Sequence, residues 1–90
     1  MIDIDRVRNW LIEAGSITEV AHITIFQGRR KNSKGEPQTV TVKLFDLGPK
    51  AQPDLRYYCE ATSAEGKTAT GNNAATIEDA IAIAHWNDID

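Results

Sequence analysis

Residues 39–47 read TVTVKLFDL and carry the clearest strand signal in the chain. The apolar residues Val40, Val42 and Leu44 alternate with more polar neighbours. This two-residue period is typical of a strand that buries one face and leaves the other partly in water. The segment therefore indicates an antiparallel sheet, and its strand neighbours should lie on either side of it in the sequence.

The segment upstream predicts the first partner strand. β-branched residues become frequent in SITEVAHITIF, residues 16–26, and apolar groups fall on both faces of the expected strand. The connecting stretch GRRKNSKG, residues 28–35, is rich in turn formers, so the two strands should form a hairpin. Four cations are expected at or near its tip: Arg29, Arg30, Lys31 and Lys34.

Two further strands are predicted downstream. Pro49 and Pro53 break regular pairing in LGPKAQPD, and LRYYCEATS, residues 55–63, follows as a third strand. A turn at residues 64–66 then leads into a short last strand, KTATG. The more apolar face of the third strand, which we expect to be buried, contains Leu55, Tyr57, Cys59 and Ala61.

An amphipathic helix is predicted at the start of the chain. Asp3 or Asp5 can cap it, and Gly15 is placed to end it in a left-handed conformation. The apolar residues between these positions recur at helical spacing and share one face: Ile4, Val7, Trp10, Leu11 and Ala14.

A second helix is predicted to begin after Thr76, a capping residue followed by two acids that interact favourably with the helix dipole. Its main apolar stripe leaves out Ile83 and Trp86, which lie far around the helix. Two interpretations stay open. The two side chains either pack against the first helix near Trp10, or form an exposed anchor for a partner.

The predicted order is α-β-β-β(-β)-α, which is an α+β domain. Three to four antiparallel strands form a small sheet, with an N-terminal and a C-terminal helix packed on one face. Ninety residues are too few for two independent cores, so residues 1–90 are expected to form a single domain.

The last third of the chain resembles two known families. EGKTATGNNAATIEDAIAIA, residues 65–84, looks like the final hairpin and helix of double-stranded-RNA-binding domains. That family contacts phosphates through lysines at the start of the last helix. Glu78 and Asp79 stand at the matching place in this chain and have the wrong charge for phosphate. The resemblance implies the fold and argues against RNA binding.

The same segment is similar to HicB-type antitoxins, a family in which a glycine precedes a threonine cap, a pair of acids and an alanine. This resemblance implies binding to a protein toxin. The matching residues are Gly71, Thr76, Glu78, Asp79 and Ala80.

Composition excludes several classes of function. The chain lacks an apolar run long enough to span a bilayer, and its charged start, MIDIDRVRN, is unlike a signal peptide, so a cytoplasmic protein is expected. Cys59 is the only cysteine, which rules out an intrachain disulfide. His22 and His85 are not spaced as a catalytic or metal-binding motif. We therefore expect no enzymatic activity, no cofactor and no metal.

The charge distribution predicts an interaction function. The formal net charge is -3, yet residues 28–35 hold four cations and no acid, while the rest holds all thirteen acids. We expect a small interaction module with a protein partner, regulatory in the manner of an antitoxin or inhibitor, and self-association as a homodimer is compatible. The alternative is weak binding of duplex RNA through the basic loop 28–35. The candidate partner-binding residues are Arg29, Arg30, Lys31, Lys34, Ile83 and Trp86.

Overall fold

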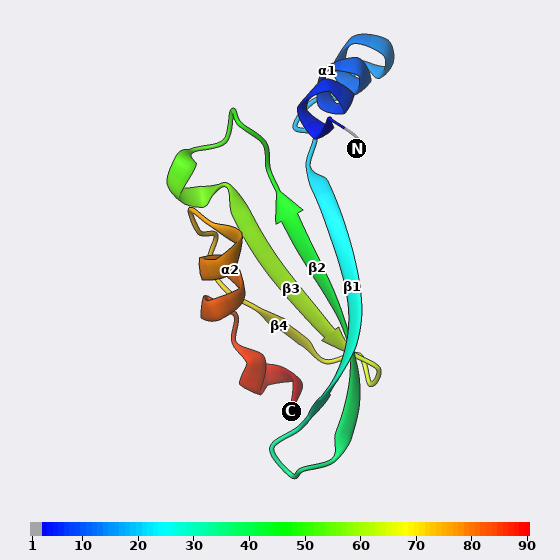
Figure 1. The fold of residues 1–90 in the computed structure, drawn as a ribbon, viewed down its shortest axis with the longest axis vertical. Coiled ribbons are helices and arrows are strands. Elements are labelled where there is room, and N and C mark those ends of the chain that lie inside the picture. The colour runs from blue at the N-terminus through cyan, green and yellow to red at the C-terminus, as the bar shows by residue number, and fades with distance from the viewer. Residues whose placement is uncertain (1–2) are drawn as a thin grey trace.

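The computed structural model describes residues 3–90 as an elongated α+β protein, 49 × 23 × 22 Å, in which four antiparallel strands form one sheet (Figure 1). The strand order is β1-β2-β3-β4, and the predicted class and element order are confirmed, fourth strand included. The elements are α1 (Ile4–Gly15), β1 (His22–Lys31), β2 (Pro37–Asp46), a 3-10 turn η1 (Pro53–Leu55), β3 (Tyr57–Ser63), β4 (Thr68–Thr70), α2 (Ile77–Ile83) and a second 3-10 turn η2 (Trp86–Ile89).

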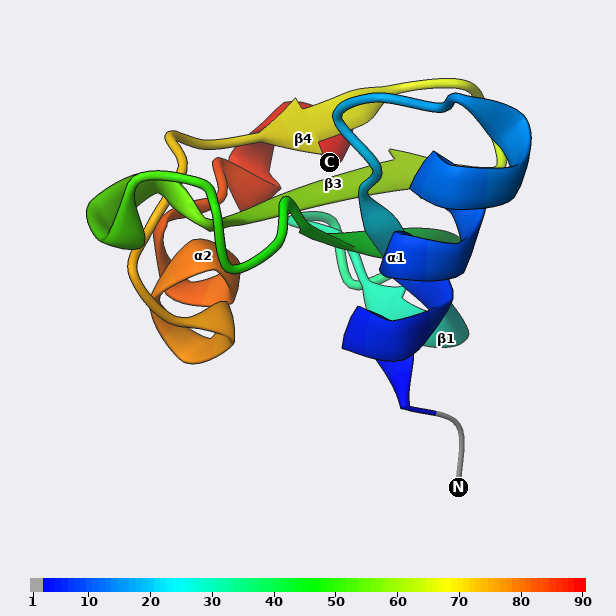
Figure 2. The ribbon, with the colours of Figure 1, turned by 90° about the horizontal axis from the view of Figure 1, so that it is seen from above.

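The two faces of the sheet differ in what covers them. Paired residues share a face, and the register places Val42 opposite Ala61 and Leu44 opposite Cys59. α2 and η2 pack on this side, which we call the α2 face (Figures 1 and 2). Within residues 3–90 no helix covers the other side, the bare face, where the Phe45 and Tyr58 rings lie with centroids 5.4 Å apart.

Small side chains form most of the core and let α2 approach the sheet closely. Cys59 is 1% exposed, so the predicted burial of this residue is confirmed. Only Ile89 and Cys59 are large among the fully buried side chains of the described residues. The rest of the buried core is formed by Val40, Ala61, Ala69, Ala74, Ala80 and Ala84.

The last helix is shorter than its apolar period predicts. α2 ends at Ile83, because the backbone turns extended at Ala84 and the His85 amide donates to the Thr70 carbonyl at 3.0 Å. The hydrogen bond between His85 and the end of β4 therefore ends the helix. Trp86 follows in η2 and packs against two groups of core residues, one around Ala61 and Ile89 and one around Cys59 and Ala80. Its indole N–H donates to the Ile81 carbonyl at 2.9 Å.

The first helix forms as predicted but lies elsewhere than predicted. Asp3 caps it by accepting from the Arg6 amide, and the left-handed residue that ends it is Ser16 (φ 51°), one position after Gly15. Instead of packing on a face of the sheet, α1 lies beyond the end of the sheet where β1 begins (Figure 1). Trp10 is 56% exposed there, so the interpretation in which Ile83 and Trp86 pack against the first helix near Trp10 is wrong.

A substitution at Gly71 tests how closely the chain after β4 packs against the end of α2. A Cβ built on Gly71 would lie 2.7 Å from the Ile83 carbonyl oxygen, a backbone atom that cannot move alone. We predict that Gly71→Ala lowers the free energy of unfolding by about 1–3 kcal/mol, the usual cost of overpacking. Thermal and denaturant unfolding followed by circular dichroism measures the change.

Gly28→Ala is the matched control, because a Cβ at Gly28 meets nothing within 4 Å. This substitution should leave stability unchanged or raise it slightly, since alanine restricts the unfolded chain more than glycine. Equal stability of the two variants would contradict the close packing of α2 on the end of β4.

Candidate functional site

The hairpin tip, residues 32–36, is a compact turn held by local hydrogen bonds. The Asn32 side-chain oxygen accepts from the amides of Lys34 (2.9 Å) and Glu36 (3.0 Å), and Gly35 adopts φ 77°. This agrees with the turn chemistry that the sequence predicts. The strands extend further than expected, however, so Lys31 and the two arginines before it belong to β1.

Strand alternation separates the four candidate cations. Arg29 and Lys31 lie on the bare face and Lys34 lies in the turn, and all three are exposed. Arg30 lies on the α2 face, where its Nη1 contacts the Asp90 carboxylate at 2.7 Å and the Gln38 side-chain oxygen at 2.9 Å. Arg30 is therefore half-buried and paired with an acid, unlike the other three cations that were expected with it near the tip.

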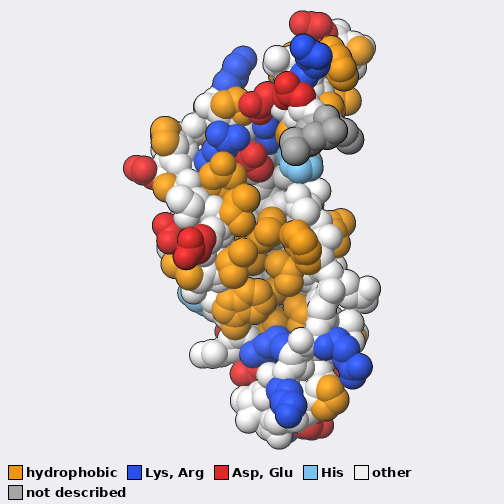
Figure 3. All heavy atoms as spheres, in the orientation of Figure 1, with side chains coloured by type: hydrophobic (Ala, Val, Ile, Leu, Met, Phe, Trp, Pro, Cys, Tyr) orange, Lys and Arg blue, Asp and Glu red, His pale blue; other side chains and the backbone are white. Residues whose placement is uncertain are grey.

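An apolar groove lies on the α2 face, between α2 and β1. α2 packs against β3, and Val42 and Leu44 of β2 are partly buried against the core, so the β1 side of this face stays open beside the continuous apolar area that Figure 3 shows. The groove has a volume of about 390 Å³. Phe26 is 55% exposed in it and Ile77 is 45% exposed. The other lining residues are His22, Thr24, Leu44, Phe45 and Asp46.

The two apolar candidates from the last helix occupy different environments. Trp86 is half-buried against the core, with its N–H bonded to the backbone. Ile83 is exposed at the end of α2 and is not one of the residues that line the groove. The structure therefore does not bring Ile83 and Trp86 into one helical stripe, since η2 begins after the helix has ended.

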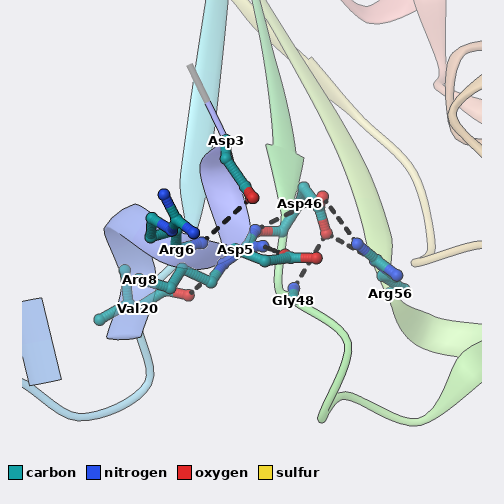
Figure 4. Close-up of polar contacts among 8 residues, drawn as sticks. All are labelled: Asp3, Asp5, Arg6, Arg8, Val20, Asp46, Gly48 and Arg56. Carbon is teal, nitrogen blue, oxygen red and sulfur yellow. Dashed lines mark hydrogen bonds and ion pairs between the residues drawn. The ribbon is translucent and has the colours of Figure 1, made fainter. Parts of the chain in front are cut away.

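An ion cluster around Asp46 ties α1 to the sheet (Figure 4). Arg56 donates to both carboxylate oxygens of Asp46, at 2.7 and 3.1 Å, and the Gly48 amide adds a bond at 2.9 Å. Arg8, from α1, lies 3.4 Å from the same carboxylate. The hydrogen bond from Arg56 lowers the pKa of Asp46 from its ordinary 3.8 to about 2.

Arg8 completes the joint by binding three segments at once. Its guanidinium donates to the Asp46 carbonyl (2.9 Å), the Val20 carbonyl (3.3 Å) and the Asp5 carboxylate (2.8 Å). A second hollow of about 830 Å³ lies beside it, between α1 and the segment after β2. Within residues 3–90 no buried side-chain nitrogen or oxygen lacks a partner, so these polar groups are already satisfied.

The described residues contain no assembled catalytic group. His22 lines the groove, His85 is exposed beyond α2, and burial raises the pKa of the Cys59 thiol, which leaves it poorly nucleophilic. In residues 3–90 no three potential metal ligands gather in one place. No helix in the same range is long and apolar enough to cross a bilayer.

Sequence reasoning missed the groove. The first strand has apolar residues on both faces, which left its orientation ambiguous, and the register with β2 places Phe26 beside Val42 on the α2 face. The helical period of the last segment includes Ile77, which the structure leaves 45% exposed as the first residue of α2. The apolar residues on both faces of the first strand were the sequence signal for this groove, because the seven residues of α2 do not cover all of them.

Comparison of the chain with protein-family models, with curated proteins and with solved structures finds no match. The groove and the basic hairpin end are therefore interpreted from their own geometry and charge.

The Asp46 cluster predicts a defined acid sensitivity. A carboxyl group whose pKa is lowered in the folded state stabilises the fold above its unfolded pKa of 3.8, and this contribution is lost as the pH falls toward 2. We predict that Asp46→Asn lowers the free energy of unfolding at pH 7 by about 1 kcal/mol, because partial exposure screens the pair. The variant should also lose less stability than the wild type between pH 4 and 2.

Urea unfolding at several pH values measures both effects. Asp54→Asn is the control, since Asp54 is exposed and makes no ion pair among the described residues. If Asp46→Asn and Asp54→Asn gave the same pH profile, the Asp46 carboxylate would not be stabilised by its pairs with Arg56 and Arg8.

Proposed function

We propose that this chain is a small non-enzymatic interaction domain that binds a protein partner in the apolar groove, as a regulator of the antitoxin or inhibitor kind. The observation that carries the proposal is the exposure of large apolar side chains on the open half of the α2 face. Phe26 and Ile77, from two different elements, are each about half exposed around one hollow. Contiguous exposed apolar surface of this kind marks interaction sites.

The exposed cations lie at the hairpin end of the sheet, away from the residues that line the groove, and favour a partner that carries an acidic surface there. At the hairpin end, Figure 3 shows basic side chains next to the apolar area. Arg29, Lys31 and Lys34 are exposed and form no ion pair within residues 3–90. Such cations raise the rate of association with an acidic surface and add little to affinity. The groove would then supply affinity, and the hairpin end would supply orientation.

The resemblance to HicB-type antitoxins supports a protein partner, because those domains bind a protein toxin. The acids Glu78 and Asp79 in the first turn of α2 oppose phosphate at the place where the RNA-binding domains carry lysines.

Duplex RNA is the second candidate, favoured by the three exposed cations at one end of the hairpin. With Arg30 paired to Asp90, at most three phosphates are neutralised, so the log-log slope of affinity against salt would be no steeper than about -3.

Ile77→Asp tests the groove. Ile77 is the first residue of α2, where a carboxylate interacts favourably with the helix dipole, so the variant should fold. A charge in the apolar groove should weaken partner binding at least about tenfold. The tagged chain captures its partner from nuclease-treated extract, and calorimetry with the purified partner then gives the affinities of wild type and variant.

Ile83→Gln is the matched control, because Ile83 lies on the same helix with similar exposure, 41% against 45%, but outside the groove. Its affinity should equal that of the wild type. Loss of binding only with Ile83→Gln would place the contact at the far end of α2 and refute the groove. A retained species that nuclease removes would favour the RNA alternative.

A further inference from the structure

We propose that the chain forms a symmetric dimer in which β1 pairs antiparallel with β1 of a second copy, joining two four-stranded sheets into one. This inference concerns the edge of the sheet and does not depend on the groove or on its partner.

The outer edge of β1 is long and unprotected. β1 is a ten-residue edge strand, and Figure 1 shows no described element beside its outer side. Outside the sheet ladder, no backbone hydrogen bond within residues 3–90 involves a residue of β1. Protein edges are usually blocked by proline, by charge or by a covering segment. From His22 to Gln27, β1 has no proline, lysine, arginine or acid.

Apolar side chains beside this edge are exposed on both faces of the sheet. Ile25 is 61% exposed and Ile23 is 44% exposed on the bare face, and Phe26 is 55% exposed on the α2 face. Pairing with a second strand would cover side chains on both faces and satisfy the outward backbone groups in the same step.

Symmetry and charge select one register. A two-fold axis through an antiparallel pair must pass between a residue and its own copy, and it keeps both α2 helices on the same face. With Ile25 at the axis, residues 22–28 form the ladder, and Ile23 lies opposite Gln27 of the second copy. Moving the axis toward the hairpin would lengthen the ladder but would pair Arg29 or Arg30 with the other β1. With Ile25 at the axis, the ladder is as long as it can be without including these cations.

Charge complementarity at the two ends identifies a second copy as the occupant. Antiparallel pairing brings α1 and its linker, residues 3–21, to the hairpin end of the other copy. Residues 3–21 hold four acids and two arginines, whereas residues 28–36 hold four cations and one acid. In the chosen register Lys31 of one copy lies beyond the start of the other β1, on the side of the linker that contains Glu19.

The position of α1 gives the dimer additional contact area. α1 lies beyond the end of β1, where it carries exposed apolar side chains next to the region that the other hairpin would occupy (Figure 1). These side chains are Trp10, Leu11 and Ile12, at 56%, 39% and 41% exposure. A stable interface buries about 800 Å² per partner, more than a seven-residue ladder gives by itself, and α1 can supply the difference.

Disulfide trapping tests the register. Ile25→Cys should form an intermolecular disulfide under mild oxidation, because Cβ atoms of directly opposed residues lie within about 5.5 Å. Gln27→Cys is the matched control on the same strand and face. Two copies of residue 27 would be four residues out of register, roughly 13 Å apart, too far to be bridged. The wild type, whose only thiol is the buried Cys59, should not crosslink.

Light scattering during size-exclusion chromatography measures the mass without any crosslink. The wild type should show twice the 9.9 kDa of one chain at high concentration. Ile25→Arg should restore the monomer with an unchanged unfolding temperature. A wild-type monomer at all concentrations up to about 1 mM, a dimer that persists with Ile25→Arg, or equal crosslinking of the two cysteine variants would each overturn the proposal.

A charge exchange tests the proposed ends of the interface. Lys31→Glu should weaken the dimer about four- to 25-fold, because the symmetric dimer contains this pair twice and one exposed ion pair contributes about two- to five-fold. Glu19→Lys in the same chain should restore the affinity, because each copy then presents the opposite charges. No recovery in the double variant would refute the chosen register. None of these measurements needs a groove partner, so a failure of the dimer is distinguishable from a failure of the proposed function.

Discussion

The shortness of α2 is the constraint on which the exposed surfaces of this protein depend. Seven helical residues and a 3-10 turn cover β3 and β4, and the pairing of His85 with the end of β4 prevents the helix from continuing. Close packing is possible because the contact is lined by alanines and by Gly71, so the covered half is dense and small. The side of this face that β1 forms must either face water or find cover from another molecule.

The N-terminal helix is held by charge instead of by apolar packing. Arg8 and Arg56 meet the Asp46 carboxylate at the end of β2, and Arg8 also binds the carbonyls of Asp46 and Val20. A helix of twelve residues is marginally stable alone in water, so this joint is what places α1 relative to the sheet. Its apolar side chains stay exposed because the joint lies at the end of the sheet, beyond either face. α1 can therefore contribute to an interface without disturbing the core.

The separation of the basic residues follows from strand geometry. Alternation along β1 sends Arg29 and Lys31 to the bare face and Arg30 to the α2 face, where Asp90 neutralises it. The hairpin therefore presents fewer exposed cations than the sequence indicates. The groove and the outer edge of β1 are next to one another, yet the groove is formed by side chains and the edge by backbone. The two surfaces share Phe26, which lines the groove and lies beside the outer edge of β1.

The sequence by itself determined the element order, the cap at Thr76, the turn around Asn32 and the burial of Cys59, and it limited the first cap to Asp3 or Asp5. Each of these depends on local hydrogen bonding or on a clear period along one segment. The end of α2, the environment of Trp86, the Arg30 pair and the place of α1 were decided by contacts between residues distant in the chain. His85 meets Thr70, Arg30 meets Asp90, and Arg8 meets Asp46. Periodicity cannot show such contacts, because it describes which side of an element is apolar and not which other segment lies against it.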